Sequence, residues 1–349
     1  MIKVGISHGD INGIGYEVII KTFLDNRILE MCTPIVYGSS KVASFHRKAL
    51  NLENFSFNII GKAQDANPKR ANLINCTNDD INIEIGKSTA EAGLASIKAL
   101  NLAVDDAIQG KIDVLITAPI NKENVQSKEF NFNGHTEFLQ SKTNSDDVLM
   151  LLCSEVMRVG IVTSHLPLSQ VSSAITEAVI LKKLEILNKS LIEDFGIRKP
   201  RIAVLGLNPH AGDGGLLGAE ETEIIIPAIK NARQNNIMAF GPYPADGFFG
   251  NGSFKKFDGI LAMYHDQGLA PFKALSFEDG VNYTAGLPIV RTSPAHGTAY
   301  DIAGKNQASP DSFRQAIYLA CDIFNNRKMY KELNENPMKV EVIQQKERR

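Results

Sequence analysis

The sequence of 349 residues lacks several features that would narrow its function at once. It has no tryptophan, which excludes nothing, and its four cysteines (Cys32, Cys76, Cys153 and Cys321) lie far apart without forming a CxxC pair. This spacing argues against a disulfide framework or a structural zinc site and favours reduced thiols. The 37 Lys and Arg residues nearly balance 39 Asp and Glu residues, for a net charge of −2. Nothing in that balance suggests bulk binding to nucleic acid or to an anionic membrane.

Long apolar runs are missing too. No segment is long enough to span a bilayer, and MIKVGISHGD at the N-terminus begins directly with a strand-like pattern where a signal peptide would carry an apolar stretch. Neither a GxGxxG fingerprint nor a Walker loop is present. The glycine-rich GDINGIG at residues 9–15 favours a tight turn with close backbone approach over a nucleotide-binding loop. We therefore expect a cytoplasmic protein that binds neither membranes nor nucleic acid.

The chain does show an alternation of short β-rich apolar runs and longer helical patterns. The predicted strands are residues 2–7, 33–39, 111–119, 157–165, 201–210 and 257–265, and the predicted helices are residues 89–110, 176–196 and 220–236. Thr176 and Glu220 are candidate helix starts, and Gly110 and Gly196 are candidate helix ends. The alternation predicts an α/β protein with a largely parallel sheet, whose ligands bind beyond the carboxyl ends of the strands. Residues 51–80 and the charged tail at 339–349 are predicted to be irregular.

Three of the seven histidines close strand-like runs in the same way: His165 in VGIVTSH, His210 in AVLGLNPH and His265 in ILAMYH. Three imidazoles converging at strand ends could bind one divalent metal ion and leave positions open for a substrate. Each histidine taken singly could instead be a hydrogen-bonded strand-end residue. The shared position at strand ends favours the metal site.

Other polar residues follow strands or begin helices. Asp246 in GPYPADGFF and Asp266 in YHDQG could orient a metal ligand or move a proton, although loop capping explains Asp266 as well. His135 and Thr136 in NGHTEFL stand at a predicted helix start, where an anion could bind or where Thr could simply cap the helix.

Three further candidates lie in a segment that is otherwise poor in charge: Lys273, Asn282 and Arg291. Lys and Arg are common partners of phosphates and carboxylates. Surface solvation is the alternative, but it suits Arg291 poorly, because LPIVRTSP would bury a lone guanidinium.

Seven of these motifs together resemble a known enzyme family. GDxxGIG, TAPINKE, GHTEFL, LNPHAGDGG, GPYPADGFF, YHDQGLAPFK and GLPIVRTSPAHGTAYDIAGKN, spread over about residues 3–330, are similar to 4-hydroxythreonine-4-phosphate dehydrogenase of vitamin B6 biosynthesis. One departure is Ile11-Asn12, where the family usually has Pro-Ala, and residues 50–85 match poorly.

The resemblance implies a fold like that of isocitrate and isopropylmalate dehydrogenases, with two α/β domains and a central cleft. Residues 1–125 with 288–349 would form an outer domain on the cofactor side. Residues 126–287 would form a central domain that carries the metal, the substrate and the dimer contact. A homodimer with active sites shared across its interface is expected.

The resemblance also implies NAD or NADP and one divalent metal per site, with Zn, Mg, Co or Mn as candidates. The implied metal ligands are His165, His210 and His265, of which His265 would serve the neighbouring subunit. The implied substrate contacts are His135, Thr136, Lys273, Asn282 and Arg291. His296 and Asp301 are cofactor candidates, and Asp246 is the candidate for orienting metal-bound groups or accepting a proton.

The implied reaction is oxidation of 4-phosphooxy-L-threonine (4-hydroxythreonine-4-phosphate) to a β-keto acid that decarboxylates to 3-amino-2-oxopropyl phosphate. A related dehydrogenase of 4-phospho-threonate or 4-phospho-erythronate would use the same metal and anion contacts. Two further alternatives are a metal-dependent lyase or hydrolase of sugar phosphates without a redox step, and a non-catalytic binder of small molecules.

Overall fold

The computed structural model describes residues 1–52, 54–77, 81–127, 130–132 and 134–336. The charged tail predicted at residues 339–349 lies outside the described residues, as does part of the irregular region predicted at residues 51–80. Within the described ranges, no helix is both long and apolar enough to cross a membrane.

One sheet of twelve strands runs through the molecule in the order β3-β4-β2-β1-β5-β12-β11-β6-β7-β10-β8-β9. Its strands are β1 (Ile2–Ser7), β2 (Cys32–Gly38), β3 (Asn58–Ile60), β4 (Asn72–Asn75), β5 (Val114–Thr117), β6 (Leu149–Cys153), β7 (Arg158–Thr163), β8 (Arg201–Leu205), β9 (Met238–Tyr243), β10 (Gly259–Tyr264), β11 (Val281–Ala285) and β12 (Val290–Pro294). β11 is antiparallel to β12 and β6, and β6 is antiparallel to β7, whereas the other neighbours pair in parallel. The prediction of an α/β fold with a largely parallel sheet is confirmed.

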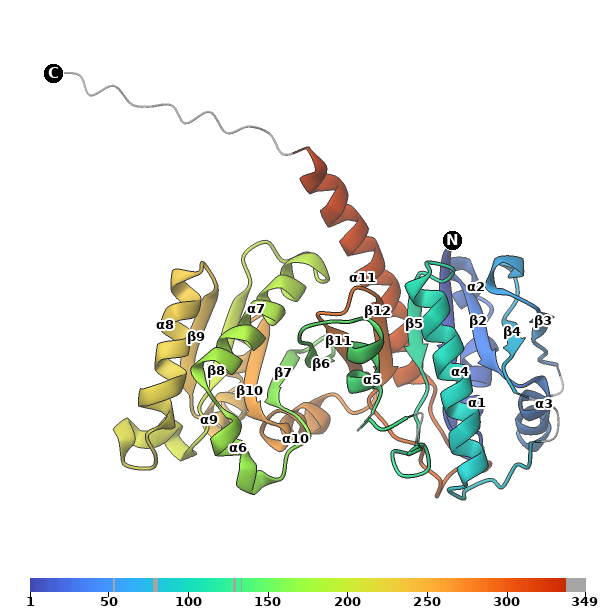
Figure 1. Cartoon of the computed structure of the whole chain (residues 1–349), viewed down its shortest axis with the longest axis horizontal. Helices are drawn as coiled ribbons and strands as arrows, with labels where there is room; N and C mark the ends of the chain where they lie inside the picture. Colours follow the sequence, from blue (N-terminus) through green and yellow to red (C-terminus); the bar gives the residue numbers. More distant parts are fainter. Residues whose placement is uncertain (53, 78–80, 128–129, 133, 337–349) are drawn as a thin grey trace.

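The sheet thus consists of two parallel halves joined through β11 and β6 (Figure 1). The α-helices are α1 (Gly15–Phe23), α2 (Ile28–Met31), α3 (Ser40–Ala49), α4 (Ala90–Ile108), α5 (His135–Lys142), α6 (Leu168–Ala174), α7 (Glu177–Glu193), α8 (Ile226–Gln234), α9 (Ala245–Gly250), α10 (His265–Leu275) and α11 (Asp311–Glu335). In Figure 1, α11 stands between the two halves, α1 and α4 lie with one half and α7 and α8 with the other. The division into an outer domain (1–125 with 288–349) and a central domain (126–287) stays a prediction.

The six predicted strands are all present, and they are buried as parallel strands should be: every residue of β2 and five of the six in β10 are buried. The strand predicted at residues 201–210, however, ends at Leu205. His210 therefore does not close a strand, and the prediction that all three histidines end strands alike is wrong for it. β3, β4, β6, β9, β11 and β12 were not predicted.

Two predicted helix starts can be compared with the structure. The Thr176 side chain accepts a hydrogen bond from the Val179 amide and caps α7, as predicted. Glu220 precedes a π-helical turn (Glu221–Ile225) that leads into α8, and its side chain makes no capping hydrogen bond. Gly110 and Gly196 follow α4 and α7 with φ of 68° each, a conformation that glycine adopts without strain.

The glycine-rich loop between β1 and α1 is a tight turn, and hydrogen bonds to distant segments of the chain hold it in place. The Ile14 amide donates to the Thr298 carbonyl at 3.0 Å. Buried Asn12 accepts from the Glu84 amide at 2.8 Å and donates to the Lys87 carbonyl at 3.0 Å and to Thr89 Oγ1 at 3.1 Å. The departure at Asn12 thus anchors residues 84–89 to the loop, which explains why an amide side chain stands there.

Candidate active site

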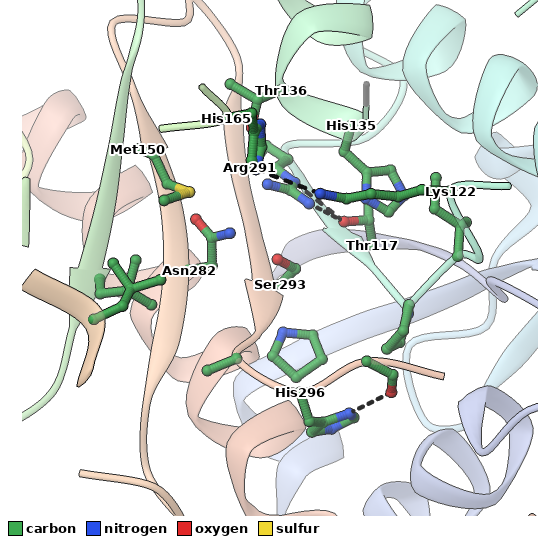
Figure 2. Close-up of a pocket in the computed structure, with 18 of the residues that line it drawn as sticks. Thr117, Lys122, His135, Thr136, Met150, His165, Asn282, Arg291, Ser293 and His296 are labelled. Carbon is green, nitrogen blue, oxygen red and sulfur yellow. Dashed lines mark hydrogen bonds between the residues drawn. The ribbon is translucent and has the colours of Figure 1, made fainter. Parts of the chain in front are cut away.

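A cavity of about 240 Å³ lies where β5, β12, β11 and β6 face α5 and α10. It brings together eight of the eleven predicted site residues: His135, Thr136, His165, His265, Lys273, Asn282, Arg291 and His296. Figure 2 shows Asn282, Arg291 and Ser293 from neighbouring strands facing this space, with Lys122 and His135 across from them. His210, Asp246 and Asp301 do not line the cavity, and all three are exposed.

The lining is strongly cationic. Two lysines and one arginine (Lys122, Lys273 and Arg291) and four histidines face the cavity, and Glu137 is the one carboxylate among the lining residues. Such a site favours a ligand that carries more than one negative charge. Prediction of substrate contacts at Lys273, Asn282 and Arg291 is compatible with this lining.

Arg291 is the most deeply placed of these bases, with 2% of its surface exposed. Its guanidinium donates from Nη2 and Nε to Thr117 Oγ1, at 2.6 and 3.1 Å, and from Nη1 to Thr284 Oγ1 at 3.1 Å. Burial lowers the pKa of Arg291 to about 9, and nearby Glu137 opposes that shift. The group is therefore charged at neutral pH and forms no ion pair with a described carboxylate. A buried cation with only hydroxyl partners is a ready site for an anionic ligand.

The start of α5 adds two side chains to the lining. The helix begins at His135, after Gly134, as predicted. Burial, helped by the positive charges of Arg291 and Lys122, holds the pKa of His135 well below its ordinary value. Its Nε2 has no partner among the described residues. His135 is thus a neutral imidazole with a free nitrogen, beside Thr136 at a helix N-terminus that favours anions.

His165 and His265 lie side by side, with ring centroids 6.3 Å apart. His265 contacts Asp266 Oδ1 through Nδ1 at 2.6 Å, and His165 contacts Glu137 Oε1 through Nδ1 at 3.1 Å. Metal-binding imidazoles commonly place one ring nitrogen on a carboxylate and offer the other to the metal. The two rings therefore fit a divalent ion as part of its ligand set. Among the described residues, however, no group of three or more His, Cys, Asp or Glu side chains is close enough to hold a metal by itself.

His210 lies outside the cavity, in a loop with an unusual backbone. Residues 210–214 all have positive φ, including His210 at 54° and Asp213 at 44°. The buried carboxylate of Glu221 holds the start of this loop by accepting from the Leu207 and Asn208 amides, both at 2.7 Å. Strained backbone of this kind concentrates at functional sites. His210 is exposed and is not among the residues that line its own chain's cavity.

Lys122 and Glu137 are lining residues that the sequence analysis did not select. Both stand inside motifs noted there, Lys122 in TAPINKE and Glu137 in GHTEFL. The signal that could have identified them is a charged side chain inside each of these two motifs. Their roles depend on contacts with His165, which is 43 residues from Lys122 and 28 from Glu137 in sequence.

The fold and the cavity define an α/β protein with a histidine-rich site for a small anionic molecule. The sequence profile of the family described as pyridoxal phosphate biosynthetic protein PdxA matches residues 30–320. The chain belongs to this family. A 4-hydroxythreonine-4-phosphate dehydrogenase from Bacteroides thetaiotaomicron is 56% identical over 347 residues, which cover 99% of this chain and 95% of the relative.

Two other proteins are also similar to this chain. A crystal structure of 4-hydroxythreonine-4-phosphate dehydrogenase from Klebsiella pneumoniae superposes with a TM-score of 0.79 at 33% identity, covering 93% of this chain and 100% of that one. A protein from Oceanobacillus iheyensis, provisionally named D-threonate 4-phosphate dehydrogenase, is 39% identical over 324 residues, which cover 92% of this chain and 97% of the relative.

Proposed function

We propose that this chain is an NAD- or NADP-dependent 4-hydroxythreonine-4-phosphate dehydrogenase of pyridoxal phosphate biosynthesis. It oxidises 4-phosphooxy-L-threonine to a β-keto acid, which loses CO2 to give 3-amino-2-oxopropyl phosphate. The family and the closely similar dehydrogenase from Bacteroides thetaiotaomicron support this reaction. The observation that carries the proposal is the cationic cavity around buried Arg291. Its charge suits a substrate with a phosphate and a carboxylate.

The chain's own residues would bind and orient that substrate. Arg291 and Lys273 approach from opposite halves of the sheet, on β12 and α10, and would hold the two anionic ends. Asn282, Thr136 and the free nitrogen of neutral His135 would hydrogen-bond the remaining polar groups. His296, on the segment after β12, lines the cavity and would face the nicotinamide cofactor, with exposed Asp301 farther along the same segment.

His165, His210 and His265 would hold the divalent ion, and when bound such an ion lowers the pKa of a hydroxyl and stabilises negative charge beside a carbonyl. The single chain gathers only His165 and His265. A second subunit would therefore supply the missing imidazole, and Asp246, which also lies outside this cavity, would act on the partner's site. The expectation that His265 in particular serves the neighbour stays a prediction.

Exposed leucines support a homodimer that completes the site. Leu166 and Leu168 follow His165 with 43% and 74% of their surface exposed, and Leu216 and Leu217 follow His210 with 78% and 43% exposed. Large apolar side chains exposed beside functional residues are typical of an interface between chains. We expect such a homodimer to work in the cytoplasm, where its free thiols stay reduced.

A redox assay tests the proposal. Purified protein with 4-phosphooxy-L-threonine and NAD or NADP should accumulate reduced nicotinamide, measured by its absorbance. A chelator should abolish the signal, and Zn, Mg, Co or Mn should restore it. Turnover of the substrate without nicotinamide reduction would favour a lyase. Negligible rate here with rapid oxidation of 4-phospho-threonate or 4-phospho-erythronate would assign the chain to the related reaction.

A further inference from the structure

The ammonium of Lys122 contacts a histidine nitrogen that a metal ion would use. Lys122 follows β5, and its Nζ lies 3.3 Å from Nε2 of His165 (Figure 2, dashed line). This is the one polar contact of the ammonium with a described residue. Lys122 forms no ion pair with Glu137, although both charges face the same cavity.

The two contacts of His165 fix where its proton lies. An ionised carboxylate only accepts hydrogen bonds, and an ammonium only donates them. Nδ1 must therefore carry the hydrogen that is donated to Glu137 Oε1 at 3.1 Å, and Nε2 must present its lone pair to Lys122. In this arrangement the lone pair of Nε2, which a metal ion would use, faces the ammonium of Lys122.

We propose that Lys122 is an internal substitute for the metal ion: its ammonium occupies Nε2 of His165 until a divalent cation displaces it, and the released ammonium then binds the anionic ligand. This inference rests on the proposed metal role of His165. A metal ion and an ammonium cannot share one lone pair, and their like charges repel each other at contact distance. Displaced Lys122 remains in a cavity built for anions, so the metal and the anion should promote each other's binding.

Lys122 is exposed, so its substitution leaves the core intact. We would measure Mn²⁺ binding by electron paramagnetic resonance of the free ion, on the purified full chain, with and without inorganic phosphate. K122M should bind Mn²⁺ about tenfold or more tightly than wild type in the absence of phosphate, because no charged hydrogen bond must be broken first. Phosphate should then raise the Mn²⁺ affinity several-fold less in K122M than in wild type.

K273M is the matched control, because Lys273 lines the same cavity without a hydrogen bond or ion pair to any described residue. It removes the same charge and should change Mn²⁺ affinity clearly less than K122M. K122Q, which keeps a donor without the charge, should fall between wild type and K122M. Unchanged or weaker Mn²⁺ binding by K122M, or an equal gain in K273M, would overturn the proposal. These affinities need no turnover, so an inactive dehydrogenase with the expected affinities would reject the proposed reaction and leave the role of Lys122 standing.

Discussion

Arg327 on α11 donates from Nε to Oδ1 of Asp194 at 2.6 Å and thereby joins the C-terminal helix to the residue that ends α7. The other carboxylate oxygen, Oδ2, accepts from Ser190 at 2.7 Å and from the hydroxyl of Tyr283 at 2.6 Å. Asp194 is 3% exposed. Its buried charge is therefore balanced by one arginine and satisfied by two hydroxyls, across elements from both halves of the sheet.

Replacing Arg327 with Met should destabilise the protein strongly. It leaves the Asp194 carboxylate buried without its cation, which typically costs about 3–5 kcal/mol. Urea unfolding followed by circular dichroism would measure the loss in unfolding free energy. R314M is a suitable control, because Arg314 pairs with the exposed carboxylate of Asp311, and its loss should cost about 1 kcal/mol or less. Equal effects of the two variants would contradict this reading of the Asp194 pair.

Arg291 should respond in the opposite way, since its charge is buried without a carboxylate. R291M removes a desolvated cation and should leave the unfolding free energy within about 1 kcal/mol of wild type, or raise it. The KM for the phosphorylated substrate should nevertheless rise about tenfold or more, because a charged hydrogen bond is lost. Steady-state kinetics and urea unfolding of the same preparation test the expected KM and the expected stability together. A large loss of stability with unchanged KM would make Arg291 a structural residue.

His8 should make stability depend on pH. It is fully buried and stacks on Tyr16, with ring centroids 5.3 Å apart. Burial lowers its pKa from 6.5 to about 4. The unfolded chain therefore binds a proton in this window that the folded chain rejects, and stability falls as the pH drops from 6.5 towards 4.

The variant H8M isolates that contribution. Between those two pH values, wild type should lose about 3 kcal/mol more unfolding free energy than H8M does. His46, whose pKa is also lowered by burial, is present in both proteins and cancels in the comparison. Parallel pH profiles for the two proteins would show that His8 is charged or solvated in the folded state.

Mixed dimers should reveal how the three histidines form one site. H210A and H265A should each be inactive and bind metal weakly. If the two residues come from different subunits, unfolding and refolding the variants together creates one intact site per heterodimer, and random pairing restores about a quarter of wild-type activity. No recovery would place both imidazoles in one chain. The pair H165A and H265A then tests the prediction that His265 serves the neighbour, because only that arrangement lets this pair recover.

Sequence patterns predict the parts of this site that depend on local position. His165 and His265 follow adjacent parallel strands, β7 and β10, so their convergence follows from the sheet alone. Burial of Arg291 is predictable because it directly follows the apolar run at residues 287–290 in a segment poor in charge. His210 is different, since its place depends on the loop that Glu221 holds from another element.

Other features depend on contacts between distant segments. The antiparallel pairing of β6 with β11 joins two strands that lie far apart in the sequence, which no local pattern encodes. Likewise, Lys122 and Glu137 matter only because the fold brings the end of β5 and the start of α5 to the end of β7. The sequence shows that both residues are charged, and the tertiary structure shows what their charge acts on.

The antiparallel joint of the sheet is also the floor of the cavity. Met150 and Leu152 on β6, Asn282 on β11 and Arg291 on β12 line it, and Lys273 reaches it from α10 in the other half. Twisting the two halves against each other must change the span between Arg291 and Lys273. A doubly anionic molecule held by both bases would link the two halves of the sheet and restrain their motion relative to each other. Substrate binding would then also make the whole sheet more rigid.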